Sequence, residues 1–192
     1  MSRSAFSNAW PRALAALGLA AMISTGAQSA GGQAAPMQSK ANPADVSSID
    51  ALIKATYDVI SGPAGQKRDW DRFRSLFVPG ARLIPTGLRP DSLGGGFGLR
   101  VLTPEEYVQT SGPFLENNGF FEVESGRKME QFGQIAHLFS TYESRHKAED
   151  AQPFMRGINS FQVFNDGKRW WIVTIYWAGE RKDLPIPEKY LK

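Results

Sequence analysis

Residues 158–177, INSFQVFNDGKRWWIVTIYW, are the stretch that decides the fold. Two runs of β-branched and aromatic side chains flank Asp166-Gly167, a dipeptide that tolerates the positive φ angles of a tight turn. The pattern predicts a β-hairpin with these two residues at its turn. Asn159 would then face Thr174, on a side that is apolar near the turn and polar toward the open end. The other side is also apolar, so we expect both sides of the sheet to be covered.

A basic start and an apolar run stand at the N-terminus. Arg3 and Arg12 precede ALAALGLAAMI (13–23), and small residues follow at 27–30. This order is typical of a secretory signal peptide, and the run is well short of the ~20 residues that span a bilayer. We therefore expect residues 1–30 to be a signal peptide and the mature protein to be periplasmic or secreted, with no membrane span.

The remaining composition limits the class of protein. The leader holds two arginines and no acid, so 22 Lys+Arg against 19 Asp+Glu become 20 against 19 after cleavage. No basic stripe with interleaved aromatic side chains is present, which argues against a nucleic-acid partner. The chain has no cysteine, so its core alone must hold the fold. Residues 31–44 are small and polar and predict a flexible linker, and 45–192 predict one domain.

Three helices are predicted before the main strands. The first begins after Ser47 or Ser48 and reaches about residue 60 with apolar positions at helical spacing. The second covers 69–77, where Asp69 can cap. The third begins at Thr103-Pro104-Glu105-Glu106, in which Thr caps, Pro takes the first helical position and the acids face the positive end of the helix dipole.

Strands dominate the second half of the chain. A short strand is predicted at 81–85 and an edge strand at 99–102, and 120–131 and 135–146 read as two long strands around Gly133-Gln134. That turn places Ser125 opposite Tyr142. Helices followed by four consecutive strands indicate an α+β fold, in which the helices gather on one face of a bent antiparallel sheet.

This order, together with three stretches of sequence, resembles the nuclear transport factor 2-like superfamily in its SnoaL-like bacterial branch. The stretches are DWDRFRSLFVPGARLIP (69–85), EQFGQIAHLFSTYESR (130–145) and GKRWWIVTIYW (167–177). The resemblance, over about Val46 to Trp177, implies a cone-shaped α+β barrel with a hydrophobic cavity, often in a homodimer. Members include steroid isomerases, dehydratases, epoxide hydrolases, polyketide cyclases and proteins without catalysis, so the fold alone does not decide the reaction.

Two residues are candidate catalytic groups, because chemistry in an apolar cavity rests on a carboxylate or histidine whose pKa is tuned by its surroundings. His137 lies inside an apolar strand and is a candidate base. Its alternative role is a sheet histidine bonded to Glu130 across the ribbon. Asp71 follows Trp70 on the second helix, and its alternative is plain solvent exposure or stabilisation of the helix start.

Further polar side chains are candidates to line the cavity and bind a ligand: Tyr57, Arg82, Tyr107, Tyr142, Asn159, Thr174 and Tyr176. The tyrosines are otherwise core aromatics with the hydroxyl at the rim, and Arg82 an ion-pair partner. No cofactor or metal is expected. His137 and His146 are an odd number of residues apart and would point to opposite faces of a regular strand.

Three functions stay open. The first is an exported domain that binds a small, largely apolar molecule in its cavity, closed near Tyr57 and Asp71. The second is an acid/base lyase or isomerase acting on an apolar ring or carbonyl compound. The third is a non-catalytic interaction module in which the second face of the sheet pairs two copies.

Overall fold

The computed structural model describes residues 40–89, 92 and 94–191. The expected signal peptide (1–30) and most of the expected linker (31–44) lie outside these residues. The one-turn helix α1 (Pro43–Val46) begins inside the last part of that linker, where the Asn42 side chain accepts from the Ala44 N–H. Among the described residues, no helix has the length and apolar character needed to cross a bilayer.

The three predicted helices are present. Helix α2 (Ile49–Ile60) begins after Ser48, whose hydroxyl accepts from Ala51 N, and α3 (Trp70–Ser75) begins after Asp69. Helix α4 (Pro104–Asn118) begins at a capping box, in which Thr103 and Glu106 bond each other's backbone N–H groups. It ends at Gly119, whose φ of 69° is a conformation that favours glycine.

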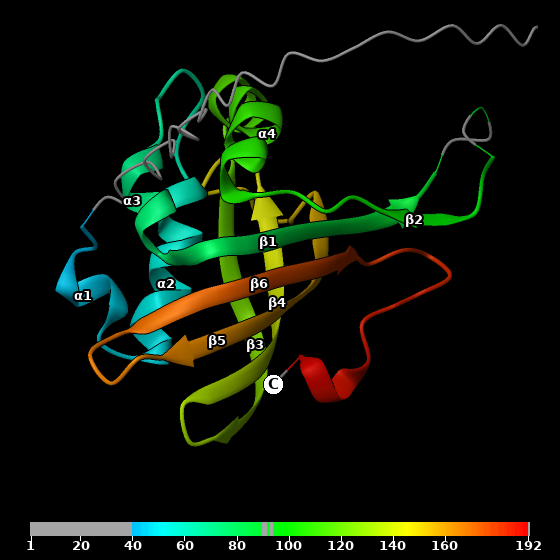
Figure 1. Cartoon of the computed structure of the whole chain (residues 1–192). Helices are drawn as coiled ribbons and strands as arrows, with labels where there is room; N and C mark the ends of the chain where they lie inside the picture. The colour runs from blue at the N-terminus through cyan, green and yellow to red at the C-terminus, as the bar shows by residue number, and fades with distance from the viewer. Residues whose placement is uncertain (1–39, 90–91, 93, 192) are drawn as a thin grey trace, which may run out of the picture. The chain divides into compact units, whose positions relative to one another are not determined.

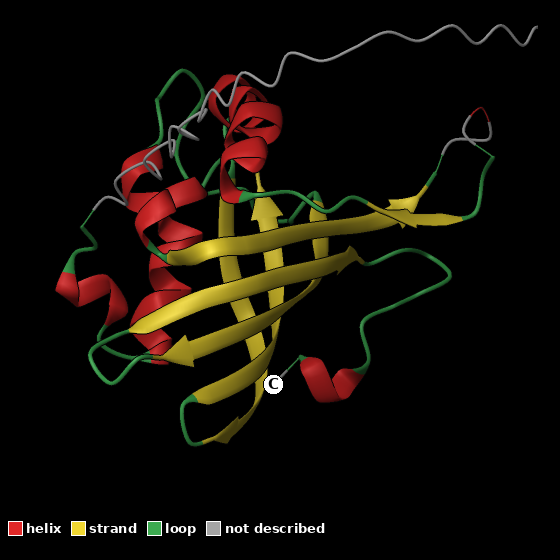
Figure 2. Cartoon of the chain, viewed as in Figure 1, coloured by secondary structure: helices red, strands yellow, loops and turns green. Residues whose placement is uncertain are grey.

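One mixed sheet of six strands carries the fold, in the order β2-β1-β6-β5-β4-β3 (Figures 1 and 2). The strands are β1 (Phe77–Leu88), β2 (Phe97–Leu99), β3 (Phe121–Phe132), β4 (Ile135–Arg145), β5 (Met155–Asn165) and β6 (Trp170–Gly179). The prediction of an all-antiparallel sheet is wrong at one pair, because β1 runs parallel to β6. The sheet bends strongly, and among the described strands none joins β3 back to β2, so it is an open cone.

The β5–β6 hairpin is present, but its predicted register is wrong. Asn165 pairs with Trp170, so four residues rather than two form the turn. The reason lies in Asp166, whose carboxylate accepts from the backbone N–H groups of Lys168 and Arg169 and from Trp171 Nε1, at 2.8 to 2.9 Å. A bulge at Val173 then shifts the register again, because Gln162 pairs with Thr174 while Val163 pairs with Ile172.

A second bulge lies in the β3–β4 ribbon. Near its turn the ribbon has the predicted register, with Glu130 opposite His137. Beyond Ser125 the register changes, and Tyr142 pairs with Glu124 instead of Ser125. Residues on the far side of this bulge therefore point to the opposite face from the one that regular alternation predicts.

The core lies between one face of the sheet, called the inner face here, and helices α2, α3 and α4. Its most deeply buried apolar side chains come from α2, from α3 and its C-cap, and from the sheet: Leu52, Ile53, Phe73, Leu76, Phe77, Leu138, Phe161 and Ile172. The opposite, outer face keeps several apolar side chains exposed. The short helix η2 (Glu188–Tyr190) packs on part of the outer face, where Thr141 Oγ1 donates to Tyr190 O.

Arg68 joins the helices at one end of the core. Its buried guanidinium donates to five backbone carbonyl oxygens, those of Ile60, Gly62, Pro63, Gln66 and Leu115, at 2.5 to 3.4 Å. Glu116 of α4 accepts from the Arg68 backbone N–H and from Trp70 Nε1. These bonds hold the end of α2, the following loop and α4 together.

Candidate functional site

A cavity of about 210 Å³ lies between the inner face and the helices. Its walls are mainly apolar and come from α2, α3, α4 and strands β1 and β3 to β6. The polar groups in the lining are few, and they are Thr56, Tyr57, Tyr107, Ser111, Glu122, Tyr142 and Asn159. A mostly apolar hollow with a few polar groups is the ordinary form of a small-molecule site.

Glu122 of β3 places a carboxyl group in this cavity. Ser144 Oγ donates to Glu122 Oε2 at 2.8 Å, and Asn159 Nδ2 lies 3.4 Å from Oε1. Among the described residues that line the cavity none is Lys or Arg. Burial raises the pKa of Glu122 to about 7, because the two hydrogen bonds offset only part of the loss of hydration. The cavity thus holds a carboxyl group able to gain or lose a proton near neutral pH.

A chain of hydrogen bonds leads from Asn159 toward the surface. Tyr57 Oη lies 2.7 Å from Ser140 Oγ, and Ser140 Oγ donates to Glu124 Oε1 at 2.6 Å. Because Ser140 gives its proton to the Glu124 carboxylate, Tyr57 donates to Ser140 and its oxygen accepts from Asn159 Nδ2 at 3.1 Å. Arg127 fixes the far end of this chain by pairing with Glu124 through two nitrogens, at 2.8 and 2.6 Å.

This chain sets the polarity of the cavity. The hydroxyl proton of Tyr57 is used within the protein, and burial raises the pKa of Tyr57, so the hydroxyl stays neutral. The Asn159 amide nitrogen faces Tyr57 and Glu122, and among the described residues no donor reaches its carboxamide oxygen. That oxygen remains an acceptor for a bound molecule.

Tyr107 and Tyr142 supply the free donors. Among the described residues neither hydroxyl has a hydrogen-bond partner, and both side chains line the cavity. Burial raises the pKa of each, and the nearby Glu122 carboxyl adds to the effect. The end of the Tyr142 ring packs on β5, where a Cβ atom at Gly157 would lie 2.4 Å from Tyr142 Oη. Glycine at position 157 therefore leaves room for this ring.

Four of the residues expected to line a cavity come together here: Tyr57, Tyr107, Tyr142 and Asn159. The two expected catalytic residues do not. His137 points to the outer face, where its Nε2 lies 3.1 Å from Ser160 Oγ, so its partner is Ser160 rather than Glu130. Asp71 is exposed on α3 and pairs with Arg74 at 3.0 Å, so it does not help to close the cavity.

Three further expected residues also lie outside the cavity. Arg82 points away from the core and donates to the carbonyl oxygens of Gly80 and Ala81. Thr174 and Tyr176 belong to the outer face, because the bulge at Val173 turns them away and brings Ile175 and Trp177 to the cavity instead. The described residues hold no group of three or more His, Asp or Glu side chains arranged to bind a metal ion.

Glu122 is the functional candidate that sequence reasoning missed. It lies in a strand with two other acidic residues, Glu124 and Glu130, and the next strand holds Glu143, so its residue type alone does not single it out. Its position opposite Ser144 follows from the bulge at Ser125. A polar Ser144 on the inner face of the neighbouring strand is the signal that could have indicated a buried partner.

Comparisons with known proteins bear on the fold. No protein-family model matches the chain, and a comparison with curated proteins yields no match. Among solved structures, one similar protein has a cystatin-like fold and unknown function and comes from Nostoc punctiforme. It is 15% identical, the match covers 72% of this chain and 92% of that protein, and the TM-score is 0.50. A putative calcium/calmodulin-dependent protein kinase II association domain from Xanthomonas campestris is 16% identical. The match covers 70% of this chain and 86% of that domain, and its TM-score is also 0.50.

A nuclear transport factor 2-like protein of unknown function from Shewanella baltica is 16% identical and covers 70% of this chain and 98% of its own, with a TM-score of 0.40. At these identities a likeness concerns the fold and leaves function open. The helices packed on one face of a bent six-stranded sheet, and the hollow between them, agree with the architecture that the sequence resemblance implied. The chain therefore shares its α+β fold with the cystatin-like protein and the association domain, and this is the architecture that the resemblance to the nuclear transport factor 2-like superfamily implied.

Proposed function

We propose that this domain binds a small, largely apolar molecule in its inner cavity, with one polar group of that molecule next to Glu122. The carboxyl group of Glu122 inside an otherwise apolar hollow is the observation that carries the proposal. A buried polar group without enough partners is costly, so a ligand that completes its hydrogen bonds gains affinity from it.

The free hydrogen-bonding groups define the polar part of this ligand. Tyr107 and Tyr142 offer donors, and the oxygen of Asn159 offers an acceptor. A hydroxyl group can accept from a tyrosine and donate to Asn159 or to the ionised Glu122. An apolar ring that carries one hydroxyl or carbonyl oxygen is therefore the chemistry that fits.

Binding of 2-naphthol, measured by isothermal titration calorimetry, tests this proposal. We expect one molecule to bind per chain. Ser111 lines the cavity from α4, whereas its neighbour Thr110 is exposed and does not. Ser111→Phe should fill the hollow and weaken binding at least tenfold, and Thr110→Phe should leave binding unchanged. Equal affinities for both variants, or no binding by the wild type, would refute the proposal.

A second candidate, an acid/base enzyme acting on a carbonyl compound, is favoured by the pKa of Glu122 of about 7. A general base works best when its pKa is close to the operating pH. Glu122 would remove a proton next to the carbonyl carbon, and the hydroxyls of Tyr107 and Tyr142 would donate to the oxygen as negative charge develops on it. The removed proton would be returned from the same carboxyl group to another carbon of the substrate.

Exchange of the α-protons of 2-tetralone in heavy water, followed by proton NMR, tests this second function. The wild type should accelerate the exchange, and Glu122→Gln should abolish the acceleration. Glu130→Gln is the matched control, because Glu130 is exposed on the outer side of the same strand. Exchange rates that are equal with Glu122→Gln and wild type would leave ligand binding as the function.

We also propose that a second copy of the chain covers the outer face. Exposed apolar side chains gather there at the turn end of β4, β5 and β3, with Phe132 85% and Ile135 60% exposed. Such a patch is unusual on a monomer. Light scattering over a range of concentrations should show a dimer, and Ile135→Glu should shift it toward the monomer. A monomer at every concentration would remove this proposal.

Export of the chain is proposed on its N-terminal sequence alone. Expression of the full chain in a Gram-negative host should release a periplasmic product whose mass corresponds to cleavage after Ala27, Ser29 or Ala30. A full-length product in the cytoplasm would count against export.

A further inference from the structure

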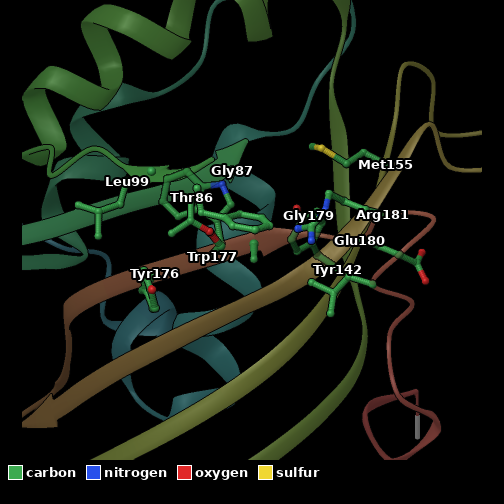
Figure 3. Close-up of a pocket in the computed structure, with 14 residues that line it drawn as sticks. Thr86, Gly87, Leu99, Tyr142, Met155, Tyr176, Trp177, Gly179, Glu180 and Arg181 are labelled. Carbon is green, nitrogen blue, oxygen red and sulfur yellow. The ribbon is translucent and has the colours of Figure 1, made fainter. Parts of the chain in front are cut away.

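An open groove of about 670 Å³ lies beside the inner cavity, around the C-terminal end of β6. Its walls come from the β1–β2 hairpin, the end of β6, the segment after it, and single residues of β4 and β5. Figure 3 shows Thr86, Gly87 and Leu99 on one side of it and Met155, Glu180 and Arg181 on the other. Of the residues expected to bind a ligand, Tyr142 and Tyr176 line this groove.

Three side chains, Tyr142, Met155 and Trp177, line both the groove and the inner cavity. They form the partition between the two hollows. Tyr142 is held by its packing on Gly157, and Tyr107 packs edge-on against Trp177 with ring centroids 6.2 Å apart. Met155 is 39% exposed and carries a flexible thioether chain, so it is the part of the partition that can move aside.

The groove is suited to an uncharged occupant. Leu99, Phe97 and Leu184 expose apolar surface to it. Its charged groups already have partners. Glu180 accepts from two nitrogens of Arg156, at 2.8 and 3.0 Å, and Arg181 pairs with Asp183. An apolar chain can cover this surface without leaving a charge unpaired.

We propose that the groove and the inner cavity form one elongated binding site for a molecule with a polar head and an apolar tail. This inference rests on the proposed binding function. The head lies next to Glu122, and the tail passes Met155 into the groove. Size supports this division, because the inner cavity of about 210 Å³ is smaller than the ~300–1,000 Å³ of ordinary ligand sites, whereas the groove lies within that range.

Binding of 4-alkylphenols, from 4-methylphenol to 4-hexylphenol, tests the proposal by calorimetry. The phenol group represents the polar head. Each methylene group that is fully buried should strengthen binding by up to about fourfold, which corresponds to ~0.8 kcal/mol. We expect this gain to continue in the wild type through the longest member, because the tail leaves the inner cavity for the groove.

Two matched variants locate the tail. Leu99 and Leu88 lie on the same hairpin and are 58% and 62% exposed, but only Leu99 lines the groove. Leu99→Asp should remove the gain of the longer phenols and leave the affinity for 4-methylphenol unchanged. Leu88→Asp should behave as the wild type. Ala178→Trp, which narrows the groove from β6, should act as Leu99→Asp does.

The outcomes separate this inference from the function on which it rests. If 4-methylphenol binds but the affinity stops rising as the chain grows, or if the two aspartate variants behave alike, the elongated site is refuted and the inner cavity alone binds. If no phenol of any length binds, the proposed binding function fails and the elongated site fails with it.

Discussion

Replacement of Glu122 by glutamine should change how the stability of the protein depends on pH. Burial raises the pKa of Glu122 from 4.5 to about 7. Between these two values the folded protein keeps a proton on Glu122 that the unfolded chain has already lost. Since the folded state binds more protons, the free energy of unfolding falls as pH rises through this window. Glutamine has no proton to lose, so the variant should lack this part of the dependence.

The size of the effect follows from the shifted pKa. At about 1.4 kcal/mol for each pH unit, the wild type should lose roughly 3 kcal/mol of stability, relative to the variant, between pH 4.5 and 7. Partial access of water to the cavity makes this an upper value. The variant also replaces the carboxyl oxygens that accept from Ser144 and Asn159. That exchange adds an offset that does not vary with pH, so the two contributions can be separated.

Urea denaturation of the wild type and Glu122→Gln, at half-unit steps from pH 4.5 to 8.5, measures this difference. The free energy of unfolding of the variant, relative to that of the wild type, should increase as the pH rises, and this difference should become constant above pH 7. All other groups titrate alike in the two proteins, so they cancel in the comparison. Parallel pH profiles for the two proteins would show that Glu122 is as well hydrated in the folded state as in the unfolded chain, and the account of the cavity would then be wrong.

Three other predictions follow from single contacts. Arg68→Met should lower the free energy of unfolding by roughly 3 kcal/mol or more in urea titrations, because it leaves several buried carbonyl oxygens without donors. The hydrogen-bond donors of its turn lower the pKa of Asp166 from 3.8 to about 2. The melting temperature of the wild type should therefore fall as the pH drops from about 4 to 2, and Asp166→Ala should not show this part of the decrease. His137→Asn should bind 2-naphthol as tightly as the wild type in calorimetry, because His137 lies on the outer face.

Helices could be predicted from sequence because their signals are local. The capping box at Thr103 and the glycine at position 119 both act within one turn of α4, and they mark its two ends in the structure. The same holds for Ser48 and Asp69 at the starts of α2 and α3. The parallel pairing of β1 with β6 could not be predicted in this way, because it joins residues about 90 positions apart and no short pattern records it.

The cavity was predictable only where its elements are regular. Tyr57 and Tyr107 follow from helical spacing, and Asn159 and Tyr142 from alternation along uninterrupted strands. Thr174 and Tyr176 were wrongly expected beside them, since alternation was carried through a strand that contains a bulge. His137 was chosen for its chemistry, and side-chain chemistry does not report which face of a sheet a residue occupies.

The bulge at Ser125 decides which carboxyl groups reach the inner face. In a regular strand Glu124 and Arg127 would point to opposite faces, since an odd number of residues separates them. In the structure Glu124 and Arg127 form a bidentate ion pair. In the register of the ribbon, Arg127 lies opposite Ser140 and Glu122 lies opposite Ser144, and all of these residues are on the inner side of the sheet. The inserted residue thus has two consequences. It brings Glu124, the last acceptor of the hydrogen-bond chain from Tyr57, to the same face as its counter-ion Arg127. It also brings Glu122 into the cavity, where none of the described lining residues is Lys or Arg. The two carboxyl groups lie two residues apart on the same strand, yet their surroundings differ. Glu124 pairs with Arg127, whereas none of the described residues that line the cavity beside Glu122 is Lys or Arg, and burial raises the pKa of Glu122.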